Sequence, residues 1–229
     1  MSALRYEVCV ETIDGVRAAL AAGADRVELC ADLSVGGITP SAGLIEWAVA
    51  AGGDRLGVHV LIRPRGGDFV YDADEEDVMA RDIRAAKSAG AHGVVIGALT
   101  PDSAVDTALT ARLIELARPL SVTFHRAFDE TADPAAAFDD VLALGADRLL
   151  TSGGAANALA GAGLIGELVR RTSAEPFEVL AGGGVTEQNA AELVRRTGVR
   201  EIHFSARSAA PDLPFTDRVA RIMAAAAGA

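Results

Sequence analysis

The segment Ala22-Gly-Ala-Asp-Arg-Val-Glu-Leu-Cys30 joins the end of an alanine-rich helical stretch to a short apolar run. Its glycine suits the left-handed conformation that ends a helix, and the run after it has the character of a strand. The same joint recurs in three more segments, Ala89–Ile96, Leu144–Thr151 and Thr197–Ser205. Helix, glycine and strand in this order are typical of the connections in a parallel sheet.

The spacing of the joints predicts how many strands the chain contains. Their glycines lie 53 to 67 residues apart, which leaves room for two strand–helix units between successive joints; they are Gly23, Gly90, Gly145 and Gly198. The additional predicted strands are Tyr6–Val10, Leu56–Ile62, Ser121–Phe124 and Phe177–Leu180. The predicted helices are Asp14–Ala22, Ser41–Ala51, Glu75–Ala89, Val105–Ala117, Pro134–Leu144, Ala158–Thr172, Glu187–Arg196 and Phe215–Ala227.

Eight alternating units in 229 residues predict a single (β/α)₈ TIM-barrel domain over residues 1–229. A doubly wound open sheet is the structural alternative. That fold usually carries a GxGxxG fingerprint straight after its first strand, and the sequence has none there.

The composition of the chain limits the kinds of partner that we expect it to bind. The net charge of −11 argues against a nucleic-acid partner, which would require a basic face. No run approaches the roughly 20 apolar residues of a membrane helix, and the first residues do not resemble a signal peptide. We therefore expect a cytoplasmic protein without a membrane or nucleic-acid partner. Its two cysteines, Cys9 and Cys30, are then expected to be reduced thiols.

Polar and apolar residues alternate along five of the predicted strands. Because the apolar face of a barrel strand packs on the helices, the polar face is expected in the pore. The pore-facing set is Glu7, Cys9, Glu11, Glu28, Cys30, His59, Leu61, Arg63, Thr123, His125, His203 and Ser205. Buried charges are costly unless they are paired, and we expect Glu7 or Glu28 to pair with Arg63. A purely structural ion-pair network is the alternative to a functional site.

Acid, base and cation together are what proton transfer beside a stabilised anion requires. The expected catalytic set is Glu7, Glu28, His59, Arg63 and His125. Within it, Glu28 or His125 would act as the general base, and Arg63 would stabilise developing negative charge. Lys87, the only lysine, is predicted in a helix away from the strand ends, which excludes a Schiff-base mechanism on lysine.

Two glycine-rich turns follow the sixth and seventh predicted strands. Their bare N–H groups, with a hydroxyl at the end of the last strand, favour an anion-binding site where barrels often hold phosphate. The expected anion-binding residues are Gly153, Gly154, Gly182, Gly183, Gly184 and Ser205. The alternative is that these glycines only permit tight turns. The loops Leu33–Pro40 and Arg63–Tyr71 are expected to close over a ligand or to form a subunit contact.

Several motifs in combination resemble the CutC family, the copper homeostasis proteins. They are Glu7–Glu11, Arg26–Cys30, Gly36–Pro40, Arg63–Asp68, Thr123–Asp129, Leu150–Gly154 and Gly182–Val185, and the resemblance runs from about Tyr6 to Ala206. It implies a TIM barrel in the cytoplasm that self-associates as a homo-oligomer. It also implies copper(I) as the bound metal, with ligands that match Cys9 and Cys30.

Two functions follow from these observations. In one, the thiols of Cys9 and Cys30 bind copper(I) together; they lie on neighbouring predicted strands, about 5 Å apart across the ladder, and thiolates suit this soft ion. In the other, the protein is an enzyme that acts on a small anionic or phosphorylated metabolite. A scaffold without a ligand is a third interpretation, but it leaves the inward-facing charges unexplained.

Overall fold

The computed structural model describes residues 4–207 and 213–229. Over these residues eight parallel strands form a closed barrel in chain order, with β8 paired to β1. The strands are β1 (Arg5–Val10), β2 (Arg26–Leu29), β3 (Gly57–Leu61), β4 (Gly93–Ile96), β5 (Ser121–Phe124), β6 (Arg148–Thr151), β7 (Glu178–Gly182) and β8 (Glu201–Phe204). The predicted TIM barrel is confirmed.

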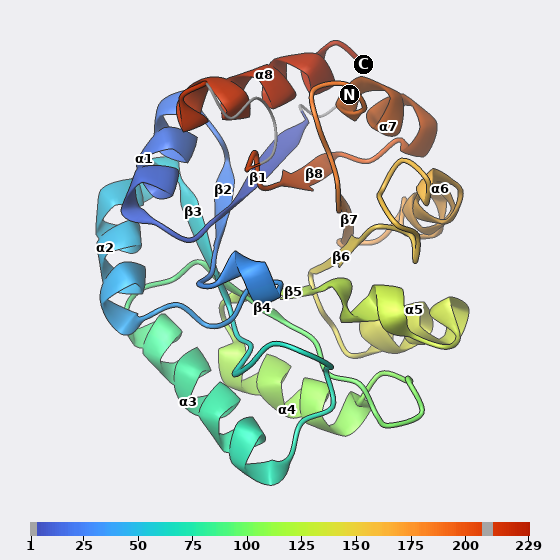
Figure 1. The fold of residues 1–229 in the computed structure, drawn as a ribbon. Helices are drawn as coiled ribbons and strands as arrows, with labels where there is room; N and C mark the ends of the chain where they lie inside the picture. Colours follow the sequence, from blue (N-terminus) through green and yellow to red (C-terminus); the bar gives the residue numbers. More distant parts are fainter. Residues whose placement is uncertain (1–3, 208–212) are drawn as a thin grey trace.

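The helices surround the strands in chain order (Figure 1). They are α1 (Ile13–Ala22), α2 (Ala42–Gly52), α3 (Ala73–Ser88), α4 (Thr107–Ala117), α5 (Pro134–Ala143), α6 (Ala162–Arg171), α7 (Ala190–Thr197) and α8 (Phe215–Ala227). Local sequence sets where several of them begin. Asp72 and Glu75 form a capping box at α3, and Asp133 caps α5, which begins with Pro134.

The glycines of the four joints occupy the positions that the sequence predicts. Gly23, Gly90, Gly145 and Gly198 follow the ends of α1, α3, α5 and α7 with φ angles of 78°, 81°, 76° and 70°. This is the left-handed region, which glycine adopts without a steric penalty. Each glycine therefore turns the chain from a helix toward the next strand.

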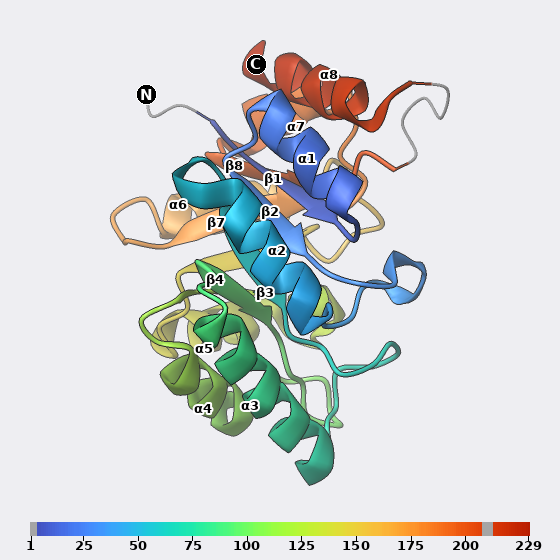
Figure 2. The same cartoon turned by 90° about the vertical axis from the view of Figure 1, so that its left-hand side faces the viewer.

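The main apolar core lies between the sheet and the helices. Val8 and Val10 on β1 and Val27 and Leu29 on β2 are buried there, while Glu7, Cys9 and Glu28 alternate with them on the pore side. The loops after β2 and β3 extend from the same end of the barrel (Figure 2), so polar groups at the strand ends gather at one mouth. Among the described helices, none is both long and apolar enough to span a bilayer.

Candidate functional site

A buried charge network fills the pore near the N-terminal ends of the strands. Arg26 on β2 forms ion pairs with Glu7 on β1 and, at 2.6 Å, with Glu201 on β8. Arg148 on β6 adds a second cation to Glu201 at 3.0 Å. Burial alone would raise the pKa of Glu7, but Arg26 and His203 outweigh burial and hold that pKa far below its ordinary value. Glu7 is therefore an ionised carboxylate.

This network corrects one expectation about charge pairing. Glu7 or Glu28 was expected to pair with Arg63, whereas Arg26 is the partner of Glu7. Arg26 shares the pore face with Glu28 because the two residues are two positions apart on one strand. That alternation was the signal that could have identified Arg26.

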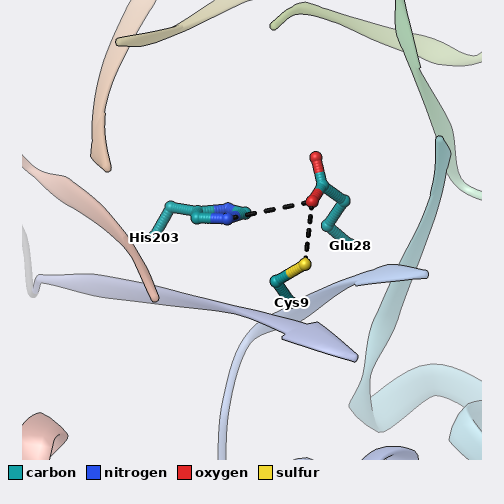
Figure 3. A group of neighbouring side chains, drawn as sticks. All are labelled: Cys9, Glu28 and His203. Atoms are coloured by element: carbon teal, nitrogen blue, oxygen red, sulfur yellow. Dashed lines mark hydrogen bonds and ion pairs between the residues drawn. The ribbon is translucent and has the colours of Figure 1, made fainter. Parts of the chain in front are cut away.

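Above the network, Cys9, Glu28 and His203 form a compact cluster (Figure 3). The Cys9 thiol donates a hydrogen bond to Oε2 of Glu28 at 3.1 Å, and Nε2 of His203 lies 3.8 Å from the same oxygen. Nδ1 of His203 lies 2.7 Å from Oε1 of Glu7. Because Glu7 is ionised, this nitrogen is the donor, and Nε2 faces Glu28 and the cavity.

The protonation of this cluster depends on burial and on its own contacts. Burial raises the pKa of Glu28, although His203 acts in the opposite direction. Burial alone would lower the pKa of His203, but the charges of Glu28 and Glu7 and the hydrogen bond to Glu7 raise it. Glu28 and His203 thus influence each other's pKa through charge, across the 3.8 Å between Oε2 and Nε2.

Cys30 is the second thiol of the predicted pair. Its Sγ lies 3.7 Å from Sγ of Cys9, and both residues are buried beside Leu61 and Val95, with Leu33 packed on the group. The contact with Cys30, burial and the neighbouring Glu28 raise the pKa of Cys9 well above its ordinary value. The structure therefore brings the two sulfurs together and keeps Cys9 as a protonated thiol.

A cavity of about 730 Å³ opens at the C-terminal ends of the strands. Among the sequence-predicted residues, its lining includes Cys9, Glu28, Arg63, His125, Gly154, Gly183, Gly184 and Ser205. Glu7, His59, Gly153, Gly182 and Cys30 are not part of that lining. Glu7 and His59 are buried in the pore, where burial lowers the pKa of His59 to about 3 and keeps the ring neutral.

Arg63 is held by backbone carbonyl groups. Its Nη1 donates to the carbonyl oxygens of Val35 and Gly37 at 3.1 and 2.9 Å, and its Nη2 donates to that of Gly67 at 2.6 Å. The guanidinium also lies over the ring of Phe69, 4.8 Å from the centroid. Arg63 therefore connects the loop after β2 to the loop after β3, while its side chain lines the cavity.

His125 follows β5 and is almost completely buried. Its Nδ1 accepts a hydrogen bond from the backbone N–H of Ala127 at 3.0 Å. Burial, reinforced by the charge of Arg63, lowers the pKa of His125 to about 3. The neutral ring then carries its single proton on Nε2, and this atom has no acceptor among the described residues.

The two glycine-rich turns differ in what contacts their N–H groups. After β6, the carboxylate of Asp129 accepts from the backbone N–H groups of Ser152 and Gly154 at 3.0 to 3.1 Å and from the hydroxyl of Ser152 at 2.9 Å. After β7, the N–H groups of Gly183 and Gly184 have no acceptor among the described residues. One turn thus holds an internal carboxylate, and the other lines the cavity with two N–H groups that have no acceptor among the described residues.

Three cavity residues with specific polar contacts, Arg126, Asp129 and His203, were absent from the predicted site. Arg126 follows His125 directly, and its Nε donates to Asp129 at 2.8 Å. His203 was recognised as pore-facing but had no assigned role, because the contact with Glu7 joins the two ends of the chain and strand alternation shows no such distance. Asp129 gave no periodic signal, since it lies in the short 3₁₀ segment Arg126–Glu130.

Comparison with known proteins agrees with this architecture. The model of the CutC family matches residues 4–208. A CutC protein of Photobacterium profundum is 44% identical over 208 residues, covering 91% of this chain and 84% of that protein. The human copper homeostasis protein cutC homolog is 46% identical over 202 residues, covering 88% of this chain and 73% of that protein. The crystal structure of CutC from Streptococcus agalactiae superposes with a TM-score of 0.83 at 34% identity, covering 88% of this chain and 98% of that chain.

Proposed function

This chain belongs to the CutC family, and we propose that it binds copper(I) as its cargo through Cys9 and Cys30. The separation of 3.7 Å between the two sulfurs is the observation that carries this proposal. Two thiolates that each lie about 2.3 Å from one metal ion can be at most about 4.6 Å apart. The pair therefore fits a shared ion without movement of the strands.

The chemistry of the donors also suits copper(I). Thiolates are soft ligands, which favour copper(I) over magnesium or calcium. Because the pKa of Cys9 is raised, copper(I) would have to displace the proton of this thiol, and copper binding should weaken as the pH falls. Cys9 lines the cavity, which offers the ion a route of entry, whereas Cys30 is reached past Cys9 and Leu33.

A copper(I) competition titration under reducing, oxygen-free conditions tests this function. The Cys9→Ser, Cys30→Ser double variant should lose affinity by more than about 100-fold, because even residues that only support metal ligands contribute about 10- to 100-fold. Met223→Leu removes a sulfur outside the cavity lining and is the matched control. Equal affinity in the double variant and in the wild type would exclude this pair, provided that circular dichroism shows both proteins folded.

We also propose a second function, acid–base catalysis on a small anionic metabolite. The chain of contacts from Glu7 through His203 to Glu28, at the floor of a 730 Å³ cavity, favours it. Glu28 is the better candidate for the general base, since Nε2 of His125 already carries a proton and cannot accept another. Catalytic bases of this kind typically contribute about 10²- to 10⁴-fold in rate.

Proton abstraction can be detected without knowledge of the natural substrate. The protein would be incubated in D₂O with a pool of small phosphorylated and carboxylated carbonyl compounds, and deuterium at carbon would be followed by NMR. Glu28→Gln should slow any exchange by about 100-fold or more, and Glu192→Gln on the exposed surface should not change it. No exchange across the pool, or an equal rate in Glu28→Gln, would contradict this function.

A further inference from the structure

We infer that the cavity contains an oxyanion subsite formed by His125, the Gly183–Gly184 turn and Arg126, which binds the phosphate or carboxylate group of a small metabolite. The inference rests on the second proposed function and deepens it, because it identifies the chemistry of the substrate. The subsite uses neither cysteine, so it is separate from the copper pair.

The first support is the unpaired donor on His125. Nε2–H is buried and has no acceptor among the described residues, although the residue lines the cavity. A buried donor without a partner costs about 1 to 3 kcal/mol, so it rarely persists without a reason. A ligand oxygen in the cavity would satisfy it.

The ring of His125 is also fixed in place. Its Nδ1 is held by the N–H of Ala127, Phe69 packs against it with ring centroids 4.9 Å apart, and a Cβ at Gly97 would overlap it. The glycine at position 97 thus leaves room for the imidazole. A donor held in this way needs no reorganisation to meet an oxyanion.

The turn after β7 supplies further donors. Gly183 and Gly184 have φ angles of 100° and 67°, and the carbonyl oxygen of Gly183 accepts from the N–H of Ala158 at 2.8 Å, which anchors the turn. Their own N–H groups have no acceptor in residues 4–207 and 213–229. Successive N–H groups in such a turn form a concave anion site.

The turn after β6 shows how this barrel uses the same arrangement. There the carboxylate of Asp129 accepts hydrogen bonds from two backbone N–H groups and from the hydroxyl groups of Thr151 and Ser152, all at the end of a strand. The turn after β7 has the corresponding glycines and no such internal carboxylate among the described residues. We therefore expect an external oxyanion to occupy it.

Arg126 supplies the positive charge. Its guanidinium lies against Gly183, where a Cβ would be 3.4 Å from Cζ, and its Nη2 donates to the hydroxyl of Ser152 at 3.1 Å. The side chain is 45% exposed, so it can reach a ligand that enters from solvent. A cavity of this volume has room for a small metabolite beyond the anionic group.

The test is an NMR titration of ¹⁵N-labelled full-length protein with inorganic phosphate and, separately, with acetate. Saturable shifts of the His125 Nε2–H and of the Gly183 and Gly184 amides are expected for at least one anion, and the tighter anion identifies the group that the subsite prefers. His125→Phe and Arg126→Gln should each weaken binding by about tenfold to hundredfold. Arg84→Gln, on the exposed face of α3, should bind as the wild type does.

The possible outcomes separate this inference from the two proposed functions. Unshifted signals with both anions in the wild type would overturn it, and this result does not depend on whether a variant folds. Shifts that do not saturate, or that are equal in Arg126→Gln, would also overturn it. Saturable binding without deuterium exchange would retain the subsite and refute catalysis.

Discussion

At the scale of single residues, His125 shows how one backbone contact can decide a side chain's chemistry. The backbone N–H of Ala127 donates a hydrogen bond to Nδ1. A histidine that the sequence predicted as a candidate base is therefore a neutral hydrogen-bond donor at Nε2. The sequence placed His125 correctly at a strand end but could not show this contact. It arises from the short 3₁₀ segment Arg126–Glu130, whose geometry no hydrophobic period predicts.

The neutral state of His125 predicts a dependence of stability on pH. Its pKa is lowered from about 6.5 to about 3 in the folded protein, so between these values the unfolded chain binds a proton that the folded chain does not. The contribution to stability is therefore complete above pH 6.5 and is lost as the pH falls toward 3, by about 1.4 kcal/mol per pH unit. Urea unfolding from pH 7 to 4 should show a flatter slope in His125→Gln than in the wild type.

The range above pH 7 serves as the internal control for this comparison. There the two proteins should have parallel stability curves, because the histidine is uncharged in both the folded and the unfolded chain. Parallel curves below pH 6 as well would contradict the neutral, buried state of His125.

At the scale of elements, strand alternation predicted which residues face the pore, but not which cation pairs with which anion. Arg63 was placed on the pore face with His59 and Leu61, yet its guanidinium turns to loop carbonyl oxygens. The alternation of side chains along a strand determines which face each residue occupies, and this alternation stops where the strand ends. Arg63 lies two residues beyond β3. The conformation of the loops, and not the strand alternation, therefore determines that Arg63 binds carbonyl oxygens and not a carboxylate.

Arg63 should therefore control the order of the two rim loops. In Arg63→Lys a single ammonium group replaces the planar guanidinium, and it cannot reach all three carbonyl oxygens that Arg63 contacts. We expect faster amide exchange in residues 33–37 and 66–69, with a loss of about 1 to 3 kcal/mol in stability. Hydrogen–deuterium exchange by mass spectrometry would measure this, with Arg84→Gln as the control. Unchanged exchange in both loops would show that Arg63 does not hold them.

The glycine joints allow a second prediction at this scale. Gly23, Gly145 and Gly198 have positive φ, and a Cβ at each would meet no atom within 4 Å. Replacement by alanine should therefore cost only the backbone penalty, about 1 to 2 kcal/mol per site. Gly163 also has open space but lies within α6 without a positive φ, so Gly163→Ala should stabilise by up to about 1 kcal/mol. Thermal unfolding of the four variants tests whether conformation, rather than contact, selects these glycines.

At the scale of the whole molecule, the buried charge network joins the two ends of the chain. Arg26 connects β1 and β2 to Glu201 on β8, and Arg148 extends the network to β6. The sequence indicated the number of strands and a polar pore, but this closure depends on pairs up to 196 residues apart, such as Arg26 with Glu201 and Glu7 with His203. Such contacts exist only once the barrel has closed, so local sequence patterns carry no signal for them.

Loss of the shared carboxylate should weaken the closure of the barrel as one unit. Glu201→Gln removes the charge between Arg26 and Arg148, both largely buried, and a broken buried pair costs about 3 to 5 kcal/mol. Because the network spans β1, β2, β6 and β8, unfolding should remain a single transition at a lower urea midpoint, with fluorescence and circular dichroism coincident. Glu192→Gln breaks an exposed pair with Arg196 and should change stability by less than about 1 kcal/mol. Equal effects of the two substitutions would mean that the network does not stabilise the closed barrel, since the exposed pair would then contribute as much as the buried one.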